Sequence, residues 1–242
     1  MKYCEISHFT HPEHKLKFEY SEFPFKCDGC NEVGIGSRYK CSICDYDLHV
    51  HCAVPSPSIC HAFYKKCSFQ FLTVPPGDLP RYCNACDKDV SGFVYHCRSC
   101  GYDLHPCCAK LPMVLDDGEI KLYLYRKARS ACHRCGRKGR SWSYRSECKK
   151  YSLHVACVRE MIVESWYEIY REGNKGKGLG MMRIPRLKNT LQSSHGSGGR
   201  SKGKLRKCCE IAGLAVQFVI SAVLGDPTVL IAGVVGSLMS GG

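Results

Sequence analysis

Cysteines and histidines at short, regular spacing are the residues of this chain that could do chemistry. The 242 residues include 20 cysteines and 11 histidines. Two thiolates separated by two residues can bind one metal ion from the same tight turn, and an H-x-x-C pair can do the same. C-x-x-C pairs begin at Cys27, Cys41, Cys83, Cys97 and Cys132. H-x-x-C pairs begin at His49, His105 and His154. These residue types favour zinc, which takes four such ligands in a tetrahedron.

The pairs recur in register, which indicates three repeats. In the first run, Cys27–Cys52, ten residues separate the two C-x-x-C pairs and four precede the H-x-x-C pair. The second run, Cys83–Cys108, has the same two spacings. The third run, Cys132–Cys157, keeps one C-x-x-C pair and the H-x-x-C pair. Two C-x-x-C pairs, one H-x-x-C pair and two outlying residues supply eight ligands, enough for two ions in a complete repeat.

The start of the chain favours metal binding over disulfide bonding. Residues Met1–Thr10 contain no apolar segment typical of a secretory signal. We therefore expect a cytoplasmic protein, with membrane association or a nuclear location as alternatives, and not a secreted one. In such reducing compartments closely spaced cysteines act as metal ligands. No nucleotide-binding P-loop, esterase or kinase motif occurs, so those enzyme classes have no support.

Short strands and turns must hold these ligands. Small apolar and polar residues alternate between the pairs, as in Gly34–Lys40 and Ser91–His96, a pattern typical of strands joined by tight turns. A repeat of about 50 residues has too small a core to be stable alone, and metal can supply the missing constraint. After His154, apolar residues at helical spacing predict a helix that includes Val155, Val158, Ile162, Trp166 and Ile169.

Residues Phe25–Cys30 and Cys41–His49 carry a resemblance to a known family. Their phrases, F-K-C-D-G-C and C-S-I-C-D-Y-D-L-H, resemble the C1 domain of protein kinase C in its divergent plant form. The chain is similar to plant cysteine/histidine-rich C1 domain proteins over residues 5–165. The resemblance implies three tandem C1-like repeats, each a small zinc-stabilised α+β module of short β-hairpins and a short helix, followed by an apolar helical tail.

The resemblance also implies interleaved ligand sets and about four or five zinc ions. In the first repeat it assigns one ion to His14, Cys41, Cys44 and Cys60, and the other to Cys27, Cys30, His49 and Cys52. In the second repeat it assigns one ion to Cys83, Cys86, His105 and Cys108, and the other to Cys67, Cys97 and Cys100. Asp116 falls where the last cysteine of that set is missing and is an alternative oxygen ligand. In the third repeat it assigns one ion to Cys132, Cys135, His154 and Cys157, and we expect no second ion, because only Cys148 remains of that set. His11 and His61 are alternatives to the chosen ligands.

Five segments follow from this reading: module 1 at 5–60, module 2 at 61–116, a degenerate module 3 with its helix at 117–170, a linker at 171–207 and a tail at 208–242. The linker has eleven Lys or Arg against one acidic residue, so its net charge of +10 supplies most of the chain's +13. The tail contains two apolar stretches separated by Gly225-Asp-Pro227, which predicts a helix, a break and a second helix.

We expect a non-catalytic zinc protein that binds unidentified protein partners, and the resemblance implies plant signalling or stress and defence responses. A protein-disulfide reductase that uses C-x-x-C thiols is one alternative. A second is a membrane adaptor, with anionic lipid bound through residues 200–242. We do not expect diacylglycerol binding, because the ten-residue segment between the C-x-x-C pairs lacks an apolar tip. Specific nucleic-acid recognition is not expected either, because the basic linker lacks interleaved aromatic residues.

Overall fold

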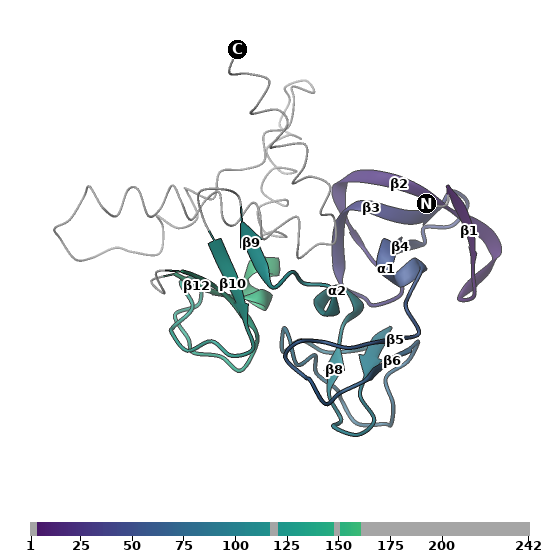
Figure 1. The fold of residues 1–242 in the computed structure, drawn as a ribbon. Coiled ribbons are helices and arrows are strands. Elements are labelled where there is room, and N and C mark those ends of the chain that lie inside the picture. The colour runs from purple at the N-terminus through teal and green to yellow at the C-terminus, as the bar shows by residue number, and fades with distance from the viewer. Residues whose placement is uncertain (1–3, 117–120, 148–150, 161–242) are drawn as a thin grey trace, which may run out of the picture. The chain divides into compact units, whose positions relative to one another are not determined.

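The structure is a computed structural model that describes residues 4–116, 121–147 and 151–160 (Figure 1). In these residues the chain forms three four-stranded antiparallel sheets. The strands of each sheet follow one another in chain order, so every sheet is a meander. The first two sheets belong to one compact unit and the third to another. The small strand-rich modules predicted from the sequence are therefore present.

The first sheet carries the longest strands. Its elements are β1 (Glu5–His8), β2 (His11–Lys26), β3 (Val33–Cys41) and β4 (Asp47–His49), and helix α1 (Val50–Ala53) follows at once. Every C-x-x-C pair of this module lies at an end of β2 or β3, and the H-x-x-C pair joins β4 to α1. The meander therefore brings ligands that are far apart in sequence to the same strand ends.

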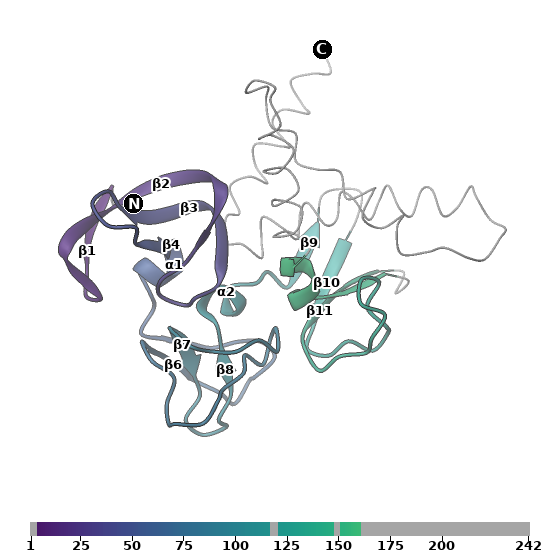
Figure 2. The same ribbon diagram turned by 180° about the vertical axis from the view of Figure 1, so that it is seen from behind.

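The second sheet repeats this order with shorter strands. Its elements are β5 (Ser58–Ile59), β6 (Phe69–Leu72), β7 (Val94–His96), β8 (Asp103–Leu104) and helix α2 (Pro106–Ala109). Because β5 pairs with β6, residues on both sides of residue 61, the boundary expected from the sequence, contribute to the second sheet. Helices α1 and α2 contact each other (Figures 1 and 2).

The third sheet contains β9 (Val114–Asp116), β10 (Lys121–Tyr125), β11 (Ser143–Ser146) and β12 (Ser152–His154). Strand β9 pairs with β10, so residues on both sides of the expected boundary at residue 117 contribute to the third sheet. Residues 155–160 are helical, as predicted for the start of the helix after His154. The rest of that predicted helix lies outside the described residues.

A small apolar core supports the first module. Leu16, Tyr39 and Leu48 from successive strands are almost completely buried there, and Phe93 of the second module packs into the same cluster. The backbone N–H of Phe93 donates to the carbonyl of Gly29 at 2.7 Å. The two modules therefore share part of their core, which limits how independently either can fold.

Three further predictions fall on residues outside the described ranges: Cys148, the basic linker at 171–207 and the apolar helix-break-helix tail at 208–242. Among the residues that are described, no helix has the length and apolar character needed to cross a membrane.

Candidate metal centres

Each sheet ends in a cluster of three cysteines and one histidine. We call these three clusters the inner clusters. All ligand atoms within a cluster lie within 4.8 Å of one another. The three inner clusters are Cys27–Cys30–His49–Cys52, Cys83–Cys86–His105–Cys108 and Cys132–Cys135–His154–Cys157. These are the sets implied by the resemblance to C1 domains, and the structure brings all twelve residues together.

The spacing within the inner clusters fits a tetrahedral zinc ion. In all three, the second cysteine of the C-x-x-C pair lies 3.4 Å from the histidine Nδ1. The cysteine that follows the histidine lies 3.8–4.0 Å from the same atom. Zinc–sulfur bonds of about 2.3 Å and zinc–nitrogen bonds of about 2.0–2.1 Å place such ligands about 3.6 Å apart. Each histidine therefore presents Nδ1 as the metal ligand.

In every inner cluster a backbone N–H donates a hydrogen bond to one cysteine sulfur. The N–H of the ligand histidine donates to the first cysteine of the C-x-x-C pair: His49 to Cys27, His105 to Cys83 and His154 to Cys132, at 3.4–3.5 Å. At Cys132 a hydrogen bond from Cys157 is the largest influence and, with backbone N–H groups, lowers the thiol pKa to about 4 despite burial.

The pKa values of Cys27 and Cys83 are shifted in the same direction. For both thiols burial is the largest influence and raises the pKa, but hydrogen bonds from neighbouring groups outweigh it and lower the pKa overall. Because zinc binds thiolates, this arrangement lowers the cost of losing a proton when the ion binds.

The outer nitrogen of the ligand histidine is held by packing. A Cβ added at Gly139 would lie 2.6 Å from His154 Nε2, and one added at Gly34 would lie 2.4 Å from His49 Nε2. Both glycines therefore leave room for the imidazole ring. In the second module Val90 stands at the corresponding position, and His105 Nε2 instead lies 2.9 Å from the carbonyl oxygen of Asp89.

Glu32 of the first module reaches this histidine of the second. Its Oε1 lies 3.3 Å from His105 Nε2, and the His105 side chain is 1% exposed. With Nδ1 facing the sulfurs, Nε2 carries the proton and points it toward Asp89 and Glu32. Burial lowers the pKa of His105, but the hydrogen bond to Cys86 and the charges of Cys86, Cys107 and Glu32 raise it to about 9. Such negative surroundings suit a zinc dication, and carboxylates behind a ligand histidine strengthen metal sites.

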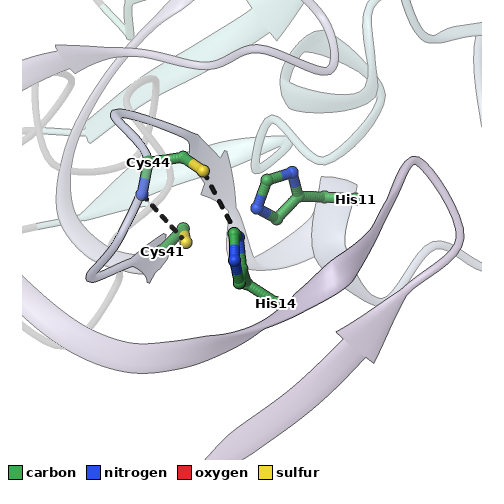
Figure 3. A group of neighbouring side chains, drawn as sticks. All are labelled: His11, His14, Cys41 and Cys44. Carbon is green, nitrogen blue, oxygen red and sulfur yellow. Dashed lines mark hydrogen bonds between the residues drawn. The ribbon is translucent and has the colours of Figure 1, made fainter.

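Modules 1 and 2 each contain a further cluster around the second C-x-x-C pair of the repeat. We call these the outer clusters. In the first module the outer cluster is His11, His14, Cys41 and Cys44 (Figure 3). Both histidines come from the start of β2, and their rings point toward the two cysteines at the end of β3. Cys44 Sγ lies 3.3 Å from His14 Nδ1, and the N–H groups of Ile43 and Cys44 donate to Cys41 Sγ.

His11 takes the place that the sequence analysis gave to Cys60. Its ring stacks on Tyr46 with centroids 4.6 Å apart, and its Nε2 is buried with no hydrogen bond from any described residue. A buried nitrogen of this kind is costly unless a ligand such as zinc satisfies it. Cys60 is exposed and directly follows β5, which pairs into the second sheet. Cys60 does not belong to the cluster of the first module.

The outer cluster of the second module contains Cys67, Cys97 and Cys100. Cys67 and Cys100 have sulfurs 3.2 Å apart. Burial opposes ionisation of Cys97, but hydrogen bonds from Ser99 and the Cys100 N–H lower its pKa to about 7. Burial and the neighbouring thiols raise the pKa of Cys67 to about 12. Asp116, the alternative ligand, belongs to strand β9 of the third sheet, where it pairs with Lys121 of β10.

Eighteen of the nineteen predicted ligands thus lie in five clusters, and Cys60 does not. Sequence reasoning kept His11 only as an alternative. Four clusters have a full set of four protein ligands, which leaves no position for a reacting water on a bound zinc. These clusters confirm the expectation of four or five zinc sites. Sites of this kind are suited to stabilise the fold.

Comparison with known proteins supports the first two modules. A sequence model of the C1 domain matches residues 9–53 and 65–109, which contain both clusters of each module. The inner cluster of the third module lies outside these matches. Probable nucleoredoxin 1 of Arabidopsis thaliana is 38% identical over 50 residues, which is 21% of this chain and 8% of that protein. No solved structure matches the chain.

Proposed function

We propose that this chain, which contains two C1 domains, is a non-catalytic zinc protein whose metal-stabilised modules present their surfaces to protein partners. The observation that carries the proposal is the set of four clusters with four protein ligands each, three of them mostly buried. Closed sites of this kind stabilise structure, whereas catalytic zinc keeps an open position. A bound ion can supply folding energy that such small cores lack.

The third module has the same role in this proposal. Its inner cluster repeats the distances and the backbone hydrogen bond of the first two. We infer that it is a degenerate C1-like module with a single zinc ion.

Loops next to the metal clusters offer apolar contacts. Ile43 lies inside the C-x-x-C turn of the first outer cluster and is 71% exposed. Leu79, 81% exposed, and Tyr82, 55% exposed, lie on the loop that leads into Cys83. Single exposed apolar residues are common on protein surfaces. These three differ because they lie on backbone that bound metal would fix. A fixed backbone lowers the entropy cost of binding a partner.

Crosslinking of the zinc-loaded full chain to interacting proteins tests this role. Leu79→Ser with Tyr82→Ser should remove crosslinks of a partner while the zinc content stays that of the wild type. The matched control is Val74→Ser, also on this loop. Partner crosslinks that survive the double substitution, and that also form without bound zinc, would contradict the proposal. Involvement in plant signalling or in stress and defence responses rests on the family resemblance and belongs to the same proposal.

Disulfide reduction is the second candidate function. The low pKa of the Cys132 thiol and the similarity of a short segment to a probable nucleoredoxin favour it. Zinc and disulfide exchange would compete for the same sulfurs, so the two functions make opposite predictions. In an insulin-reduction assay with a dithiol as electron donor, the zinc-loaded chain should be inactive. Activity that persists with all zinc bound would favour the reductase.

A further inference from the structure

Positive charge is concentrated in the third module as well as in the linker. Residues 121–146 contain nine Lys or Arg, six of them Arg, and no Asp or Glu. Residues 5–60 of the first module, by contrast, contain five basic and eight acidic residues, a net charge of −3. The nine are Lys121, Arg126, Lys127, Arg129, Arg134, Arg137, Lys138, Arg140 and Arg145. A stretch with nine basic residues and no acidic residue of its own favours an anionic ligand.

Most of these cations are exposed on loops that the metal cluster holds in place. Seven are exposed, and Arg134 and Arg145 are half-buried. The loop beyond Cys135 is tied back to Cys132: the Cys132 N–H donates to the Arg137 carbonyl, and the Gly136 N–H donates to the Cys132 carbonyl. The cationic groups of Arg137, Lys138 and Arg140 therefore project from an ordered turn.

Aromatic rings accompany the charge on one face of the sheet. Along β10, Leu122 and Leu124 are buried, so Lys121, Tyr123 and Tyr125 share the opposite face. Arg145 in β11 pairs directly with Tyr123, and its guanidinium carbon lies 4.0 Å from the centroid of the Tyr125 ring. Its Nε is buried and donates no hydrogen bond to any described residue. This face combines cations with flat groups on which a base can stack.

We propose that the third module binds single-stranded nucleic acid. The exposed Arg and Lys side chains contact phosphates, for which the guanidinium fork is well suited. Bases stack on Tyr123 and on the guanidinium of Arg145 above Tyr125. Membrane binding fits less well, because apolar tips are scarce: among the described residues of this module, the large apolar side chains that are exposed are Met113 and Val114.

The basic linker lacks the interleaved aromatic residues that a nucleic-acid surface needs. The third module supplies such residues on strand β10. Because stacking accepts any base, we expect little sequence preference.

Fluorescence anisotropy of the zinc-loaded full chain with a labelled oligouridylate of about 12 nucleotides tests the stacking. Tyr123→Leu removes the ring and Tyr123→Phe keeps it, and both leave every charge in place. The Leu variant should bind about fivefold more weakly or worse, and the Phe variant should bind as the wild type does. Native mass spectrometry must show the same zinc content in all three proteins. Equal affinity of the Leu and Phe variants would overturn the proposal.

A charge-matched pair tests the site against the linker. Arg137→Gln with Lys138→Gln and Arg140→Gln removes three charges from the module, and Arg200→Gln with Lys202→Gln and Lys204→Gln removes three from the linker. The module triple should reduce the slope of log affinity against log salt by about 2, and the linker triple by less. A loss confined to the linker triple would overturn the assignment. So would binding only to vesicles of phosphatidylserine and phosphatidylcholine, with none to the oligonucleotide.

Discussion

The inner and outer clusters of the same modules differ in how tightly the fold determines them. Inner clusters are built by a short turn, a strand end and the start of a helix, and they repeat three times with nearly the same distances. Outer clusters lie at the rim: one has two histidines, and the other has three cysteines, of which Cys100 is exposed. The fold therefore depends most on the inner clusters, which are mostly buried and have the same backbone arrangement in every module. The outer clusters differ from each other in their ligands.

Loss of an inner ligand should have the largest effect. Cys27→Ser removes a completely buried thiol that zinc requires. Apparent binding energies of structural zinc are about 10–16 kcal/mol, more than so small a core can supply, so the first module should unfold. Native mass spectrometry should record fewer zinc ions, and limited proteolysis should cut within residues 5–53. The exposed Cys4→Ser is the control; a Cys27→Ser protein with wild-type zinc content and protease resistance would refute the site.

Gly139→Ala tests the packing behind an inner histidine. The added methyl group would lie 2.6 Å from His154 Nε2 and must displace the ring from the cluster. We expect the third module to lose its zinc while the ions of the first two remain, so those ions serve as an internal control. Zinc counts by native mass spectrometry that match the wild type would show that the glycine is not needed for the histidine.

In the first outer cluster, His11 and Cys60 are the two candidates for the fourth ligand. His11→Ala should release that ion and leave the inner clusters loaded. Loss of an ion present at about 100 times its Kd costs about 2.7 kcal/mol of stability, measurable in a urea titration. Cys60→Ser should change neither zinc content nor stability. If the two variants exchange these results, Cys60 and not His11 is the ligand.

Glu32→Gln should have the smallest effect. It keeps the shape of the side chain but removes the charge 3.3 Å from His105 Nε2. We expect about tenfold weaker zinc binding at the second inner cluster, the lower end of the range for such partners. Competition with a fluorescent zinc chelator measures this, and Glu19→Gln, which disrupts an ion pair with Arg38, is the matched control. Equal affinities for the two variants would show that the modules bind zinc independently.

The same contrast explains what the sequence could predict. The C-x-x-C and H-x-x-C pairs of the inner clusters follow from local spacing, but which pairs share an ion was implied only by the resemblance to C1 domains, because spacing does not show that the first C-x-x-C pair meets the H-x-x-C pair across the sheet. His11 was harder to identify, because residues three apart on an ideal strand point to opposite faces. Pairing between β1 and β2 is irregular near His8, which pairs with His11. Cys60 was misplaced because the sequence does not reveal that Ser58–Ile59 pairs with β6. The contact of Glu32 with His105 joins two modules and has no local signal.

The number of zinc ions bound to the full chain shows whether the four-ligand clusters are metal sites. Native mass spectrometry of the zinc-loaded protein should find four ions held tightly, one for each cluster of four ligands, and a fifth held weakly by Cys67, Cys97 and Cys100. Added chelator should remove the fifth ion first. One ion or none, with thiols that react readily with an alkylating agent, would contradict the account and favour disulfide chemistry at the C-x-x-C pairs.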